Sequence, residues 1–164
     1  RKDIYVIRVG LDIDDVLADF IGAYCTRYNL ERPSTWEFDP LFGERYYELC
    51  QDIDFWLNLT PLCDPKKLSF TPVCYITARK CPREWTILWL LQNGFPNVPV
   101  YHSHLWGGPK SRVAKANKLD LFIDDCYDNY KEIKDSGIPC KLYTCSHNLQ
   151  YDVGSDRIKN MEKI

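Results

Sequence analysis

The chain has 164 residues, of which 45% are hydrophobic and 27% charged, and a formal net charge of −2. This length and balance are typical of one globular domain with a substantial core. The absence of a basic block excludes the electrostatic footprint of a duplex-nucleic-acid-binding protein. No apolar run approaches the length of a membrane span, and a GxxxxGK[ST] phosphate loop of the kinase type is absent.

Cysteines and the first residues bear on the compartment. Arg1–Asp3 lead directly into an apolar run and do not resemble a signal peptide. None of the eight cysteines forms a CxxC pair, so we interpret them as reduced thiols of a cytoplasmic chain. Two sets of residues stay open as zinc ligands, although neither has a familiar spacing. They are Cys140, Cys145 and His147, or His102 and His104.

An acidic stretch separates the first two expected elements. Residues 4–11 form a short apolar run rich in β-branched side chains, which predicts a strand with both faces covered. Apolar residues at helical spacing predict a helix over about 15–28. Asp12, Asp14 and Asp15 lie at this junction, where open α/β sheets bind their ligands. The carboxylates indicate a site for a divalent cation such as Mg²⁺, and the simpler alternative is a helix cap.

Strand and helix patterns alternate along the remainder of the chain. We expect strands over 73–76, 98–101, 119–123 and 139–143, and helices over 83–93, 111–117 and 127–135. The tail, residues 157–164, is expected to end in a polar helical turn. This alternation predicts an α/β fold, a doubly wound (Rossmann-like) parallel sheet of about five strands.

Residues 29–72 interrupt the alternation with aromatic residues and turns. We interpret this segment as a small, mainly helical cap inserted into a single domain that covers 1–164. The core then comprises 1–28 and 73–164. The alternative is a helical excursion that packs its aromatic side chains on the sheet.

Further polar residues follow two other expected strands. Thr77 ends the second strand, and Asp124 and Asp125 follow the fourth. Because parallel strands end at the same edge of a sheet, these residues are expected to lie near Asp12 and Asp14. The sequence therefore predicts one acidic site at this edge.

Four motifs in this order resemble those of the haloacid dehalogenase (HAD) superfamily of phosphatases. They are Asp12–Val16, Tyr75–Arg79, Gly108–Ser111 and Leu121–Asp125. Asp12–Phe20 further resembles the opening of the 5′(3′)-deoxyribonucleotidases, as does the aromatic cluster Asp54–Leu59 of the expected cap.

Three positions depart from that pattern. Asp15 stands where the family has Gly, and only the eleven residues Leu62–Pro72 separate the cap from the second strand. Lys110 lies 14 residues before Asp124, whereas Lys115 lies nine before it. We prefer Lys110 as the phosphate-binding lysine because Gly107–Pro109 resembles a strand-end loop, while Lys115 is expected within a helix.

The resemblance implies a Mg²⁺-dependent phosphatase that hydrolyses (deoxy)nucleoside monophosphates through an aspartyl-phosphate. Asp12 would be the nucleophile, Asp14 the general acid and base, and Thr77 and Lys110 phosphate ligands. Mg²⁺ would be held by Asp12, the Asp14 carbonyl and Asp125, and by Asp124 through water.

The aromatic residues suggest how a base is held. Phe20 and either Phe55 or Trp56 could sandwich a base, and Arg79 could reach a substrate phosphate or a surface acid. The alternative for these rings is packing within the core.

Two other functions stay open. One is a HAD phosphatase for another small phosphomonoester or a nucleic-acid 3′-phosphate end. The other is a non-catalytic nucleotide-binding module. The expected partner is a small-molecule nucleotide, with no duplex nucleic acid and no membrane, and the oligomeric state is left open.

Overall fold

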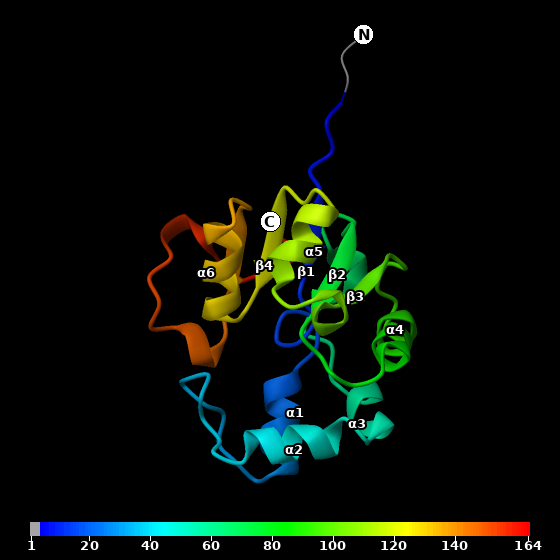
Figure 1. The fold of residues 1–164 in the computed structure, drawn as a ribbon, viewed down its shortest axis with the longest axis vertical. Helices are drawn as coiled ribbons and strands as arrows, with labels where there is room; N and C mark the ends of the chain where they lie inside the picture. Colours follow the sequence, from blue (N-terminus) through cyan, green and yellow to red (C-terminus); the bar gives the residue numbers. More distant parts are fainter. Residues whose placement is uncertain (1–3) are drawn as a thin grey trace.

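The computed structural model describes residues 4–164, so the expectation for Arg1–Asp3 lies outside it. Six strands form one sheet in the order β3-β2-β1-β4-β5-β6, and every pairing is parallel. The strands are β1 (Val9–Leu11), β2 (Cys74–Thr77), β3 (Val100–His102), β4 (Leu121–Asp124), β5 (Cys140–Tyr143) and β6 (Arg157–Ile158). The predicted α/β fold with a parallel sheet is confirmed, and Figure 1 shows helices packed around it.

Helices cover both faces of the sheet (Figure 1). They are α1 (Phe20–Arg27), α2 (Phe42–Leu49), α3 (Ile53–Leu57), α4 (Arg83–Gln92), α5 (Lys110–Ala116) and α6 (Tyr127–Asp135). Side chains of α5 and α6 pack on one face around Phe122, and those of α1 and α4 pack on the other around Leu11. Within residues 4–164, no helix has the length and apolar character needed to cross a membrane.

The first strand is shorter than its apolar run predicts. Ile4 and Ile7 are 88% and 63% exposed, and this segment extends away from the body of the protein (Figure 1). Pairing starts only where Val9 meets Leu121, because the neighbouring strands β2 and β4 begin at this level. Residues 4–7 therefore have no strand partner, and the expectation of a buried strand from Ile4 is wrong.

The first helix also starts later than expected. Asp15 has φ of +63°, which a helix does not accommodate, and the amides of Val16, Leu17 and Ala18 all bond to the Ile13 carbonyl. The chain thus makes a tight turn before the Asp19 side chain caps α1 by accepting from the Gly22 amide at 3.0 Å. The buried residues between 16 and 24 have helical spacing although the first of them lie in this turn. The spacing therefore predicted a helix that begins too early.

The C-terminal segment begins with the short strand β6, which the sequence did not predict. A turn follows at the last residues of the segment, where the Lys163 amide donates to the Asn160 carbonyl at 3.3 Å. Ile158 in β6 is buried, and its register partner in β5 is Tyr143. The Thr144 amide donates to the Ile158 carbonyl at 2.9 Å. Burial of this one apolar side chain against the sheet edge favours the extended form over a solvated turn.

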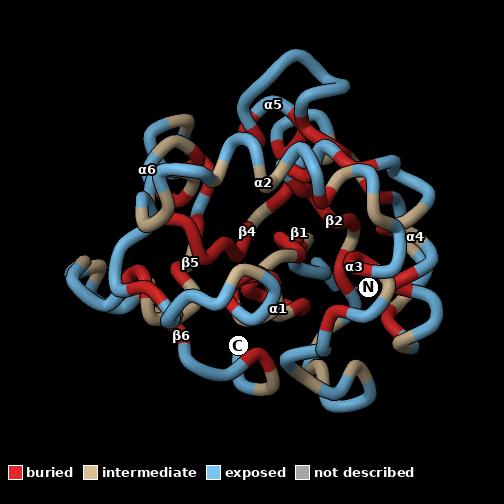
Figure 2. Tube along the Cα trace, turned by 90° about the horizontal axis from the view of Figure 1, so that it is seen from below, coloured by how far each residue is buried: buried red, intermediate tan, exposed pale blue. Residues whose placement is uncertain are grey.

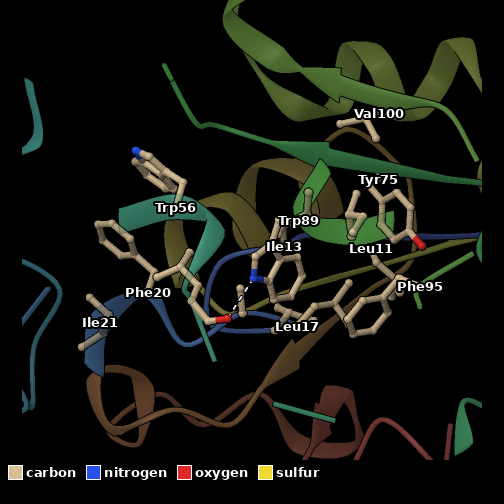
Figure 3. Packing of buried hydrophobic residues seen from close by; sticks show 14 of the residues in the cluster. Leu11, Ile13, Leu17, Phe20, Ile21, Trp56, Tyr75, Trp89, Phe95 and Val100 are labelled. Carbon is tan, nitrogen blue, oxygen red and sulfur yellow. Dashed lines mark hydrogen bonds between the residues drawn. The ribbon is translucent and has the colours of Figure 1, made fainter. Parts of the chain in front are cut away.

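Residues 29–72 contain α2, α3 and the short 3₁₀ helix η1 (Pro65–Lys67), and α2 and α3 lie beyond one end of the sheet (Figure 1). Leu49 and Trp56 are fully buried, and the Trp56 indole N–H donates to the Leu49 carbonyl at 2.9 Å. Figure 3 shows Trp56 beside Phe20 of α1. This segment is therefore anchored to α1 by aromatic packing.

The strand order reverses direction at β1 and β4, which are neighbours at the centre of the sheet. Figure 2 shows that these central strands are buried, while the outer loops are exposed. In open α/β sheets, the crevice beyond the carboxyl ends of such strands is where ligands bind. Asp12 and Asp125 come directly after these two strands.

Candidate active site

Asp12 lies at the end of β1, and a buried lysine joins it to the neighbouring strand. Lys110, the first residue of α5, places its Nζ 2.8 Å from Asp12 Oδ1 and 2.8 Å from Asp124 Oδ2. Burial alone would lower the pKa of Lys110, but the two carboxylates outweigh it and raise that pKa. Lys115 is exposed on the same helix, so only Lys110 belongs to the site.

Three carboxylates converge at this edge, as the alignment of strand ends predicts. Oxygen atoms of Asp12, Asp124 and Asp125 lie within 4.8 Å of one another. Burial, followed by the charge of Asp124, raises the pKa of Asp12 well above its ordinary value. Burial likewise raises the pKa of Asp125. Hard oxygen donors in an excess of negative charge fit a divalent cation of the Mg²⁺ type.

Asp14 is held by an arginine. The Arg79 guanidinium donates from Nε to Asp14 Oδ2 at 2.9 Å and from Nη2 to Asp14 Oδ1 at 2.7 Å. Its Nη1 donates to Thr86 at 3.2 Å, and its guanidinium carbon lies 4.7 Å from the centre of the Trp56 ring. The sequence suggested a substrate phosphate or a surface acid as the partner of Arg79. In the structure its partner is an acid, Asp14, which lines the cavity of the site.

Thr77 and His102 end adjacent strands beside this pair. Thr77 Oγ1 accepts from the Arg79 amide at 3.2 Å. His102 Nε2 lies 3.0 Å from Thr86 Oγ1, which links it to Arg79. Burial lowers the pKa of His102 to about 4. The imidazole is therefore neutral at pH 7.

The depressed pKa of His102 predicts a pH-dependent stability. Between pH 6.5, its ordinary pKa, and about 4 the unfolded chain binds a proton that the folded chain does not, so stability falls as pH falls. Relative to His102→Gln, the wild type should lose up to about 3 kcal/mol of unfolding free energy across this window. Urea titrations at pH 7, 6, 5 and 4.5 measure this difference. A difference that stays constant with pH would contradict the prediction.

A cavity of about 940 Å³ opens between the carboxylates and residues 29–72. Asp12, Asp14, Thr77, Lys110 and Asp125 all line it. Aromatic side chains form another part of its lining, which we call the aromatic wall: Phe20, Trp36, Phe42, Tyr46 and Tyr47. The structure thus brings the predicted catalytic side chains together beneath an aromatic wall.

Two of the three expected base-stacking residues do not line this cavity. Phe55 and Trp56 are absent from its walls, and Trp56 is fully buried. Phe20 is stacked on Trp56 at 5.6 Å between ring centres, and Arg79 covers the indole at 4.7 Å. A base sandwich between Phe20 and Trp56 is wrong for this structure, because the two rings already contact each other.

Two residues that the sequence did not assign to catalysis belong to the site. His147 Nε2 lies 2.8 Å from Asp125 Oδ2, and the Trp36 ring lies 4.9 Å from the imidazole. His147 was considered only as a zinc ligand with Cys140 and Cys145. Cys140 packs on the α5–α6 face instead, while Asp125, Cys145 and His147 have donor atoms within 4.8 Å of one another. The sequence did offer one signal for His147. It follows the expected strand β5 closely, and the carboxyl end of that strand lies at the same edge of the sheet as the site.

Fold and site together define an α/β protein with a carboxylate cluster at the switch point of its sheet. No family model matches the chain, and a search of curated proteins finds no match. Similar solved structures include a HAD-superfamily hydrolase, subfamily IA, variant 1, from Geobacter sulfurreducens. It has a TM-score of 0.60 and 13% identity, over 96% of this chain and 93% of that one.

Two further solved structures have the same fold. An L-2-haloacid dehalogenase has a TM-score of 0.57 and 11% identity, over 93% of this chain and 90% of that one. A HAD-family enzyme from Bacteroides thetaiotaomicron, in a magnesium complex, has a TM-score of 0.50 and 15% identity, over 88% of this chain and 96% of that one. The chain therefore has the fold of HAD-superfamily hydrolases.

Proposed function

We propose that the chain is a Mg²⁺-dependent HAD-type phosphatase that hydrolyses (deoxy)nucleoside monophosphates. The observation that carries this proposal is the position of Asp12, held by Lys110 beside Asp124 and Asp125 and facing a cavity of about 940 Å³. A binding module does not require this set of groups together. The free thiols and the nucleotide substrate fit a cytoplasmic enzyme.

The charges around the cavity support a divalent cation. Within residues 4–164, Lys110 is the lysine or arginine that bonds to this cluster, and it donates to Asp12 and Asp124 but not to Asp125. Arg79 is bonded to Asp14 instead. Their carboxylates, with the Asp14 carbonyl, would hold Mg²⁺, and Asp124 would act through water. When bound, the cation would neutralise phosphate charge and so favour phosphoryl transfer.

Asp12 acts as the nucleophile and Asp14 as the general acid and base in the proposed reaction. A carboxylate oxygen of Asp12 attacks phosphorus, the ester P–O bond breaks, and the leaving oxygen takes a proton from Asp14. Water then attacks the aspartyl-phosphate, the bond between phosphorus and the Asp12 oxygen breaks, and the proton from water returns to Asp14. Phosphate and the nucleoside leave, and both side chains regain their starting protonation.

Arg79 acts in this scheme as a positioning residue. Each oxygen of Asp14 accepts one guanidinium N–H, and a carboxylate oxygen has a second lone pair free for a proton. The Asp14 side chain is 21% exposed, whereas that of Arg79 is fully buried. The bidentate pair thus fixes the Asp14 carboxyl plane at the cavity wall.

The aromatic wall supports a nucleoside as the leaving group. Trp36 and Tyr47 are 43% and 72% exposed, and both line the cavity. Phe42 and Tyr46 are stacked at 5.4 Å between ring centres. Stacking accepts any base because every base has a π-face. We therefore move the proposed base contact from Phe55 and Trp56 to these residues.

Product release from a substrate panel tests the proposal. Phosphate is measured for the phosphoesters and chloride for the halogenated acid. The panel contains ribo- and deoxyribonucleoside monophosphates, an aryl phosphate, a 3′-phosphorylated oligonucleotide and L-2-chloropropionate, each with Mg²⁺ or with EDTA. We expect the highest kcat/KM with a nucleoside monophosphate in Mg²⁺. In EDTA we expect no turnover of any substrate. Preference for another phosphoester would contradict the nucleotide assignment. Chloride release alone would identify a dehalogenase, and nucleotide binding without turnover would identify a binding module.

Tyr47→Ala tests the aromatic wall. We expect KM for nucleoside monophosphates to rise about 5- to 150-fold, from about 1–3 kcal/mol of lost stacking, with KM for aryl phosphate changed much less. Tyr5→Ala is the matched control, because Tyr5 is 71% exposed on the segment that extends from the body. Equal increases for both substrates would contradict base stacking by Tyr47.

A further inference from the structure

A buried histidine contacts the carboxylate that ends the fourth motif. His147 lies in the 3₁₀ helix η3 (Ser146–Asn148) and is 3% exposed. Its Nε2 is 2.8 Å from Asp125 Oδ2, and Asp125 is 2% exposed. Facing a carboxylate, Nε2 carries the hydrogen and donates it, and Nδ1 has no hydrogen-bond partner among residues 4–164. Within the described part of the chain, this imidazole therefore has one hydrogen bond, which is to Asp125.

The turn that carries His147 is itself bonded to the backbone of Asp125. The Asn148 side-chain amide donates to the Asp125 carbonyl at 2.8 Å and to the Tyr143 carbonyl at 2.7 Å. Its oxygen accepts from the Cys145 amide at 3.1 Å and from Arg157 of β6 at 3.1 Å. One turn thus fixes both the main chain and the side chain of Asp125.

An aromatic residue from the cap segment covers this histidine. The Trp36 and His147 rings are 4.9 Å apart, with a tilt of 60° between their planes. Trp36 also lines the cavity that Asp12 and Asp125 face. Residues 29–72 therefore contact the acidic cluster through the imidazole.

We infer that His147 is a positioning residue for cation binding, and that Trp36 supports it by covering the imidazole. The hydrogen bond from His147 uses one lone pair of Asp125 Oδ2, and the carboxylate would keep its remaining lone pairs for a cation shared with Asp12 and Asp124. A neutral donor behind a ligating carboxylate orients it without adding a charge. The inference rests on the proposed function, since it concerns the metal centre of that site.

The competing arrangement is a second cation bound by Asp125, Cys145 and His147. The hydrogen bonds favour positioning instead. Cys145 Sγ is 3.1 Å from the Asp15 carbonyl, to which its thiol donates, and the His147 Nε2 hydrogen is donated to Asp125. Both groups already use their hydrogens on protein acceptors.

Mn²⁺ binding to two variants tests the inference, with free Mn²⁺ followed by electron paramagnetic resonance. His147→Phe keeps a ring under Trp36 but removes the donor, so we expect the Kd for Mn²⁺ to rise about 10- to 100-fold. His147→Gln keeps a donor at a similar reach and should stay within about threefold of the wild type. The Mg²⁺ concentration for half-maximal activity should rise in parallel in His147→Phe, with the nucleotide KM at saturating Mg²⁺ unchanged.

The outcomes separate the two proposals. Equal Mn²⁺ affinity in the wild type and in folded His147→Phe overturns the role of His147. Two Mn²⁺ ions per wild-type chain, falling to one in His147→Phe, would make His147 a ligand and also overturn it. No Mn²⁺ binding by the wild type would refute the metal centre itself, and with it this inference.

Circular dichroism shows whether His147→Phe is folded, and a second variant covers the case where it is not. Trp36→Ala alters a side chain that is 43% exposed and leaves the Asp125 contact in place. We expect its Kd for Mn²⁺ to rise about threefold, below the effect of removing the donor. Unchanged affinity in Trp36→Ala, with His147→Phe unfolded, would overturn the inference.

Discussion

Asp12→Asn is expected to lower phosphate release from every substrate by at least about 10⁴-fold while the fold persists. Removal of a covalent nucleophile has effects of this order. An amide oxygen does not form a stable bond to phosphorus, so the aspartyl-phosphate cannot arise. Lys110 would keep Asp124 as its partner and could still donate to the Asn oxygen, which has the same place as Asp12 Oδ1. The buried network therefore loses one charge but no hydrogen bond.

Steady-state assays at saturating Mg²⁺, with circular dichroism and a thermal melt, measure this effect. Asp128→Asn is the matched control, because Asp128 is exposed in the first turn of α6. It should keep kcat within about twofold of the wild type, as surface substitutions away from a site have small effects. Asp12→Asn turnover within tenfold of the wild type would remove Asp12 as the nucleophile.

The carboxyl ends of the strands were predictable because the apolar runs stop there at polar residues. Apolar runs that stop at Asp12, Thr77 and Asp124 predict one acidic edge, provided that the strands are parallel. The structure pairs Leu11 with Ile123, which brings Asp12 beside Asp124. The choice of Lys110 over Lys115 followed from the loop before it, and burial separates the two lysines in the structure.

The sequence-based predictions were wrong where tertiary contacts determine the structure. Ile4 and Ile7 are apolar, but β1 begins only where its neighbouring strands begin, and no local pattern shows where that is. Trp56 is as apolar in a binding wall as in a core, and only the position of Arg79 and Phe20 against it assigns it to the core. The role of His147 likewise depends on a contact with Asp125, 22 residues away in sequence.

Lys110→Met is expected to destabilise the protein by about 3–5 kcal/mol in EDTA, because it leaves the buried Asp12 and Asp124 carboxylates without their cation. For a chain of 164 residues this corresponds to a loss of about 10 °C in Tm. Met preserves most of the aliphatic volume, so the change reports charge more than packing. Turnover should also fall, because in the proposed reaction Lys110 would neutralise charge on the transferred phosphate.

Thermal melts in EDTA and in Mg²⁺ distinguish this effect from a general packing defect. A cation bound among Asp12, Asp124 and Asp125 would replace part of the lost positive charge, so the loss of Tm should be smaller in Mg²⁺ than in EDTA. Lys115→Met is the matched control on the exposed side of α5 and should change Tm by less than about 2 °C. Equal destabilisation of Lys110→Met in both buffers, with no rise in the wild-type Tm in Mg²⁺, would mean that Mg²⁺ does not bind at these carboxylates. The cation would then have to be sought elsewhere along the cavity.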